Sequence, residues 1–162
     1  MANSYSLSEV MQMAEQIEHN GVEFYTQAAK MAPDGRTRKI MEDLAEQERG
    51  HEKLFMEMRK EFCAREDAQV VDPQGQAEAY VKSVADTHVF NLGRDVTELL
   101  GSVQSPQSIL SLAIGFEKDT IAFFSALKNA VTEEHRDRVD LLIQEEIGHI
   151  RSLQEAVKGL EQ

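Results

Sequence analysis

The stretch LAEQERGHEKLF, residues 44–55, places a glutamate and a histidine, Glu48 and His51, among apolar residues at helical spacing. Residues three and four apart share one face of an α-helix, so Glu48 and His51 lie on the same face as Phe55. Such an apolar stripe normally packs against the core, where an unpartnered polar group costs free energy. The two polar side chains therefore need partners inside the protein.

A similar pattern occurs again near the C-terminus. The segment LIQEEIGH (142–149) aligns with LAEQERGH (44–51) at an offset of 98 residues. Upstream of these segments, AIGFEKDTIAFF (113–124) aligns with AEQIEHNGVEFY (14–25) at an offset of 99. Because the two offsets nearly agree, we expect the chain to use one helical hairpin twice.

Helical periodicity predicts four long helices that are separated by turn signals. The capping-box pair Ser6 and Glu9 marks the start of the first helix, and Ser105 with Pro106 marks the start of the third. A connector of roughly 45 residues joins the two hairpins, with a short helix expected over 76–90. The four long helices are predicted at 6–31, 37–62, 106–130 and 136–160.

Composition limits the class of protein. A chain of 162 residues suits one domain, 1–162, and its formal charge of -12 argues against binding to nucleic acid. The sequence has no apolar run of about eighteen residues, so no membrane span is expected. The single cysteine, Cys63, excludes an internal disulfide and a cysteine-ligated metal cluster. Together with a polar N-terminus, these features favour a cytoplasmic protein.

Each predicted long helix carries a glutamate in the middle of its apolar stripe. Glu18 lies about fifteen residues before the first turn and Glu48 about thirteen after it, so at ~1.5 Å per residue they share one level. The second hairpin repeats this arrangement. The residues expected to converge in one layer are Glu18, Glu48, His51, Glu117, Glu146 and His149.

Four carboxylates in one buried layer would repel one another and lose their hydration unless positive charge accompanied them. No lysine or arginine lies on the four stripes near that level. Two divalent metal ions would balance the four charges, with one neutral imidazole for each ion. Oxygen-rich ligation of this kind suits iron or manganese better than a structural zinc site.

In these residues the sequence resembles the ferritin-like superfamily, and specifically the rubrerythrin family. The resemblance implies an all-α ferritin-like four-helix bundle, built from two helical hairpins with a long connector between the second and third helices. It also implies two iron ions per chain, with manganese or a mixed pair as alternatives. Within the six-residue set, the glutamates of the two Glu-x-x-His motifs, Glu48 and Glu146, would bridge the ions. The other two, Glu18 and Glu117, would be terminal ligands, and each histidine would bind one ion.

The resemblance further implies reduction of hydrogen peroxide or dioxygen, with Fe(II) itself or an external electron donor as the reductant. Glu48 and Glu146 are the candidate catalytic residues, together with Tyr25, which lies two turns from Glu18 on the same face and is placed to donate a hydrogen bond to the centre. Two alternatives remain open: an iron storage or delivery subunit, and an interaction module that the metal only stabilises. We expect a homodimer.

Two features depart from the rubrerythrin pattern. The chain has no paired C-x-x-C motif of a rubredoxin domain, so electrons would come from elsewhere. Where the family has an extra glutamate one turn beyond the ligand Glu117, this chain has Thr120, and Asp119 is the nearby acid. The three other histidines are expected to be solvated: His19, His88 and His135.

Overall fold

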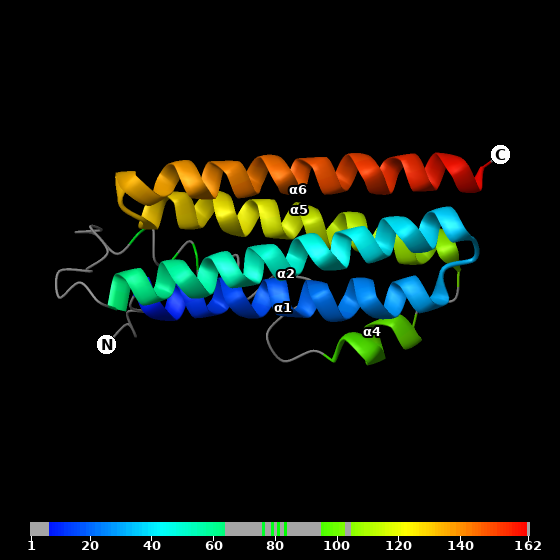
Figure 1. The fold of residues 1–162 in the computed structure, drawn as a ribbon, viewed down its shortest axis with the longest axis horizontal. Helices are drawn as coiled ribbons and strands as arrows, with labels where there is room; N and C mark the ends of the chain where they lie inside the picture. The colour runs from blue at the N-terminus through cyan, green and yellow to red at the C-terminus, as the bar shows by residue number, and fades with distance from the viewer. Residues whose placement is uncertain are drawn as a thin grey trace.

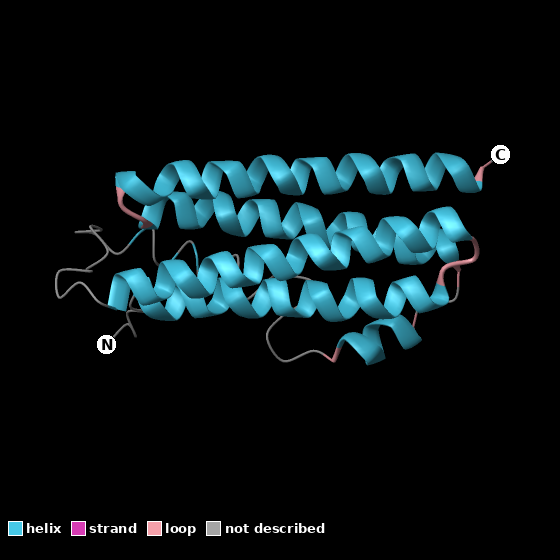
Figure 2. Ribbon diagram, in the orientation of Figure 1, coloured by secondary structure: helices cyan, strands magenta, loops and turns pink. Residues whose placement is uncertain are grey.

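The structure is a computed structural model, and it describes residues 7–63, 76, 79, 81, 83, 95–102 and 105–161. All regular structure in this part of the chain is helical, as Figure 2 shows. None of its helices combines the length and apolar character needed to cross a bilayer. The helices are α1 (Leu7–Met31), α2 (Gly35–Cys63), α4 (Val96–Gly101), α5 (Pro106–Ala130) and α6 (Glu133–Leu160).

The four long helices lie side by side as two hairpins, α1 with α2 and α5 with α6 (Figure 1). The hairpins pack on each other through α2 against α6 and α1 against α5, while α4 packs on the outer side of α1. The turns of the two hairpins lie at opposite ends of the bundle, so the chain must cross its length between α2 and α5. The predicted all-α bundle of two hairpins with a long connector is confirmed.

Side-chain caps explain where two of the long helices begin. At the start of α5, the Ser105 side chain accepts a hydrogen bond from the Ser108 backbone N at 3.1 Å, as predicted. At the start of α2, Asp34 Oδ1 accepts from the Thr37 backbone N at 2.8 Å. That bond lets α2 begin at Gly35, two residues before the predicted start. The predicted capping residue of α1, Ser6, lies outside the described residues.

The start of α6 corrects the predicted boundary. The helix begins at Glu133 rather than Arg136, and two acidic residues in its first turn face the positive end of the helix dipole. The added turn places His135 four residues before Val139, on the inward stripe. His135 is therefore buried, and the prediction that it is solvated was wrong. His19 is exposed as predicted, whereas His88 lies outside the described residues.

The stripes of the four helices form one continuous core around the middle of the bundle. Aromatic rings fill the layers next to the six predicted polar residues, and they pack edge to face or tilted with centroid distances of 5.1 to 6.1 Å. These fully buried aromatic residues are Phe24, Tyr25, Phe55, Phe116, Phe123 and Phe124.

Gly21 marks a close approach of α1 to both α5 and α2. A Cβ atom at this position would lie 2.9 Å from Cζ of Phe116 and 3.3 Å from Cγ of Glu48. Both neighbours are fully buried and have little room to move. The missing side chain therefore lets α1 pack closely beside the polar layer.

We expect Gly21→Ala to destabilise the metal-free protein by about 1–3 kcal/mol, because the added methyl group overpacks the core at Phe116. Gly115→Ala is the matched control, since a Cβ there meets nothing within 4 Å and alanine favours the helix. Thermal unfolding of both variants checks this. Equal or higher melting temperatures for Gly21→Ala would contradict the close approach.

Candidate metal centre

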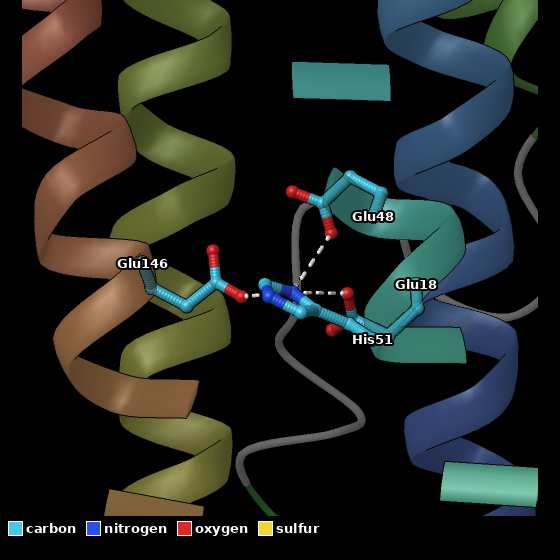
Figure 3. A group of neighbouring side chains, drawn as sticks. All are labelled: Glu18, Glu48, His51 and Glu146. Atoms are coloured by element: carbon cyan, nitrogen blue, oxygen red, sulfur yellow. Dashed lines mark ion pairs between the residues drawn. The ribbon is translucent and has the colours of Figure 1, made fainter. Parts of the chain in front are cut away.

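The structure brings together the six polar residues that the sequence places in one layer. Each comes from the inward stripe of a long helix: Glu18 from α1, Glu117 from α5, and one Glu-x-x-His pair from each of α2 and α6. All four glutamates have no exposed surface, and the two histidines are 4% and 2% exposed. Figure 3 shows the carboxylates of Glu18, Glu48 and Glu146 grouped around the His51 ring.

These residues form two overlapping groups of possible metal ligands. One group is Glu18, Glu48, His51 and Glu146. The other is Glu48, Glu117, Glu146 and His149. In each group the ligand atoms all lie within 4.8 Å of one another, and both groups share the glutamates of the two Glu-x-x-His motifs. The centre therefore has two positions for a cation with two carboxylates in common.

The first position is defined by contacts of His51 Nδ1 with three carboxylates. This nitrogen lies 2.8 Å from Glu146 Oε1, 3.3 Å from Glu18 Oε2 and 3.7 Å from Glu48 Oε2 (Figure 3). The Nε2 atom lies on the opposite side of the ring and makes a separate contact. The Nδ1 atom is thus the one that faces the cluster.

The second position repeats this geometry. His149 Nδ1 lies 2.8 Å from Glu146 Oε2, 3.1 Å from Glu48 Oε1 and 3.4 Å from Glu117 Oε1. Glu146 and Glu48 thus direct one oxygen toward each histidine. The rings of His51 and His149 stack with their centroids 5.6 Å apart and their planes 15° from parallel. The two halves of the centre are therefore related by approximate two-fold symmetry.

Burial and mutual repulsion divide the four carboxyl groups into two pairs. Burial raises the pKa of Glu18 and of Glu117 well above the usual value, and the nearby carboxylates add to this effect. Burial acts the same way on Glu48 and Glu146, but hydrogen bonds from neighbouring side chains, the histidines among them, outweigh it and lower the pKa of both. One carboxyl group in each hairpin thus favours the protonated form and the other the ionised form.

The two imidazoles carry the compensating positive charge in the metal-free protein. Burial by itself would lower their pKa values, but hydrogen bonds to the carboxylates outweigh burial. Hydrogen bonds to Glu146 and Glu18 hold the pKa of His51 far above its usual range. Hydrogen bonds to Glu117 and Glu146 raise the pKa of His149 to about 12. Two imidazolium groups then balance the two ionised carboxylates.

Many inward-facing atoms of this layer lie close to one another but still lack a hydrogen bond of normal geometry. Both oxygens of Glu18, Glu48 and Glu146, one oxygen of Glu117 and the Nδ1 atoms of both histidines are buried without one. Buried polar groups in folded proteins normally have partners, and the exceptions need an explanation. Carboxylate oxygens and imidazole nitrogens are suitable ligands for iron or manganese. The donor set therefore fits a pair of divalent metal ions.

Two contacts outside the layer were not predicted from the sequence. His51 Nε2 lies 2.6 Å from Glu145 Oε2, and His149 Nε2 lies 3.1 Å from Gln47 Oε1. Each bond crosses between α2 and α6, so each histidine is oriented by the helix opposite its own. The repeat alignment contained a signal for this pair, because the offset that matches Glu48 with Glu146 also matches Gln47 with Glu145.

Tyr25 contacts the centre, but at a carboxylate other than the neighbour that its position on α1 suggested. Its hydroxyl donates a hydrogen bond to Glu117 of α5. Tyr25 lies seven residues from Glu18, about 10 Å along the helix axis, and its ring packs against Phe116, the residue before Glu117. Burial and the adjacent Glu117 raise the pKa of Tyr25, so its hydroxyl keeps the proton.

Two other residues singled out in the sequence complete the description. Thr120, one turn beyond Glu117, is fully buried and supplies no carboxylate to the layer. Cys63 is the last residue of α2, and its side chain lies outside the described part of the structure.

Comparisons with known proteins agree with this geometry. The chain matches the solved structure of a protein from Thermotoga maritima described as a ferritin-like diiron-carboxylate protein. The TM-score is 0.70 at 23% sequence identity, and the match covers 98% of each chain, which shows a ferritin-like fold. No curated protein matches the sequence. A family model described as Rubrerythrin matches residues 9–157, and the chain therefore belongs to the rubrerythrin family.

Proposed function

We propose that the protein binds two iron ions in this layer and reduces hydrogen peroxide or dioxygen. Glu48 and Glu146 would bridge the ions, because these two carboxylates belong to both ligand groups. Glu18 with His51 would complete one position. Glu117 with His149 would complete the other position. The observation that carries the proposal is this sharing of two buried carboxylates whose oxygens form no hydrogen bond of normal geometry.

When bound, an Fe(II) pair supplies two electrons, which with two protons convert one hydrogen peroxide molecule to two waters. The centre would need an electron donor to return those electrons, because the one cysteine in these 162 residues is too few for a rubredoxin-type site of four cysteines. Manganese, or a mixed pair, is compatible with the same oxygen-rich ligands.

The residues of the chain have distinct tasks in this chemistry. The buried glutamates hold the centre away from bulk water, and the outer contacts of the histidines fix their rings with Nδ1 toward the cluster. Tyr25 keeps a proton on its hydroxyl next to Glu117. These groups are provided by rigid helices, which hold the site in position.

An open groove of about 580 Å³ gives access on the histidine side of the centre. It lies over α2 and α6, and its lining includes His51, Gln47 and Glu145. The histidines are the two members of the six-residue layer with any exposed surface. We propose that peroxide or dioxygen approaches through this groove.

Metal binding at pH 7 is expected to release at least two protons for each pair of divalent ions. His51 and His149 both have pKa values raised above 7, so both are protonated in the metal-free protein and must lose a proton to bind a metal. Affinity should therefore fall as the pH falls. Calorimetric titration in buffers of different ionisation enthalpy measures the number of protons, and a value of zero would contradict the protonated histidines.

Glu48→Ala should abolish binding of the second Fe(II) ion, because it removes a carboxylate shared by both positions. Glu46→Ala is the matched control on the same helix, where the side chain is 74% exposed. Anaerobic Fe(II) titration followed by stoichiometric peroxide is the measurement. The unmodified protein and the control should bind two Fe(II) per chain and gain near-ultraviolet absorbance as the iron is oxidised.

The same titration separates the proposal from its alternatives. Two bound ions that remain ferrous after peroxide would indicate a metal that only stabilises the fold. Uptake of many iron ions per chain, with a large assembly and mineral formation, would indicate storage. Normal two-ion binding and oxidation in Glu48→Ala would refute the assignment of Glu48 as a bridging ligand.

A further inference from the structure

The two histidines have unlike partners on their outer edges, although the ligands around the two positions correspond. His51 donates from Nε2 toward the carboxylate of Glu145 at 2.6 Å, whereas His149 donates toward the amide oxygen of Gln47 at 3.1 Å. The repeat alignment makes Gln47 and Glu145 equivalent positions. One imidazole therefore has an anion behind it and the other has a neutral group.

This difference changes how strongly each imidazole can bind a cation. A carboxylate that accepts the outer N–H of an imidazole increases the basicity of the inner nitrogen. Hydrogen bonds to a charged acceptor are also stronger than those to a neutral one. The Nδ1 atom of His51 is therefore a better donor to a metal ion than the Nδ1 atom of His149.

The surroundings of the two terminal glutamates, Glu18 and Glu117, also favour stronger metal binding at the position that contains His51. Tyr25 donates a hydrogen bond to Glu117, which withdraws negative charge from that carboxylate. The equivalent position in the second hairpin is Phe124, which has no hydroxyl. Glu18 Oε2 instead lies 3.3 Å from Nδ1 of His51, a nitrogen that would itself bind the cation. With a metal ion bound, Glu18 would therefore keep more of its negative charge than Glu117.

We infer that the two metal positions have unequal affinity, and that the first divalent ion binds at Glu18 and His51 and the second at Glu117 and His149. Glu145 is a positioning residue for the tighter position, acting through His51. The inference rests on the proposed function only in that the centre must bind two ions, and it requires no redox turnover.

Zn(II), which does not change oxidation state, is the probe. Metal-free protein labelled with ¹⁵N-histidine is titrated while NMR follows the imidazole nitrogens and calorimetry measures the two binding steps. We expect His51 Nδ1 to shift during the first equivalent and His149 Nδ1 during the second. Single substitutions assign the resonances.

Glu145→Gln should lower the affinity of the first step by about 10–100-fold, the usual effect of losing such a partner. Glu155→Gln is the matched control, because it removes the same charge from an exposed position on α6 about 15 Å farther along the helix. The control should leave both steps unchanged. Equal effects of the two substitutions would mean that Glu145 acts only through the net charge of the protein and not through its hydrogen bond with His51.

The exchanged variant, Gln47→Glu combined with Glu145→Gln, is the decisive test because it keeps the net charge and moves the carboxylate behind His149. Repulsion between two cations could produce stepwise binding by itself, but it cannot reverse the order. We expect His149 to shift first in this variant, because the introduced carboxylate then accepts the outer N–H of His149. An unchanged order would overturn the role assigned to Glu145.

The outcomes separate this inference from the proposed function. If both histidines respond in proportion from the first addition of Zn(II), the inequivalence is overturned while the dinuclear centre stands. If binding is ordered as expected but iron fails to react with peroxide, the inequivalence is supported and the redox function falls. If Zn(II) does not bind, both are overturned.

Discussion

The structure depends on one electrostatic constraint, which is that four carboxyl groups share a single buried layer. Such a layer is stable only if an equal positive charge lies within it. In the metal-free protein, the two imidazoles provide that charge and two of the carboxyl groups favour the protonated form. Two divalent ions can replace these protons without changing the balance.

This constraint also governs how the helices pack. The polar residues have to meet at one level, so the two hairpins cannot slide along each other without separating charges from their partners. Aromatic rings pack around the layer, and Gly21 lets α1 approach both Glu48 and Phe116. Close packing lowers the local dielectric and strengthens each interaction in the centre. Packing and electrostatics thus stabilise the same arrangement.

The repeated hairpin explains both the symmetry of the centre and its asymmetry. The inward residues correspond in the two halves, and they surround two similar positions. The outer partners of the histidines differ in charge, since Gln47 is neutral and Glu145 is acidic. The position equivalent to Tyr25 is Phe124, which has no hydroxyl. Such differences leave the helix packing intact while changing the surroundings of each position. A repeat that forms a symmetric site can in this way provide two unequal binding positions.

Helix periodicity and the internal repeat were sufficient to predict the bundle and the six residues that meet in its polar layer. Both signals are local, because a residue's face on a helix depends on its spacing from its neighbours along the chain. The sequence did not predict that Tyr25 reaches Glu117, that Gln47 and Glu145 contact the histidines, or that His135 is buried. Those features depend on the rotation and crossing of helices and on one extra turn at a helix start. Only the tertiary structure decides them, because they join residues far apart in the sequence or depend on how the turn packs.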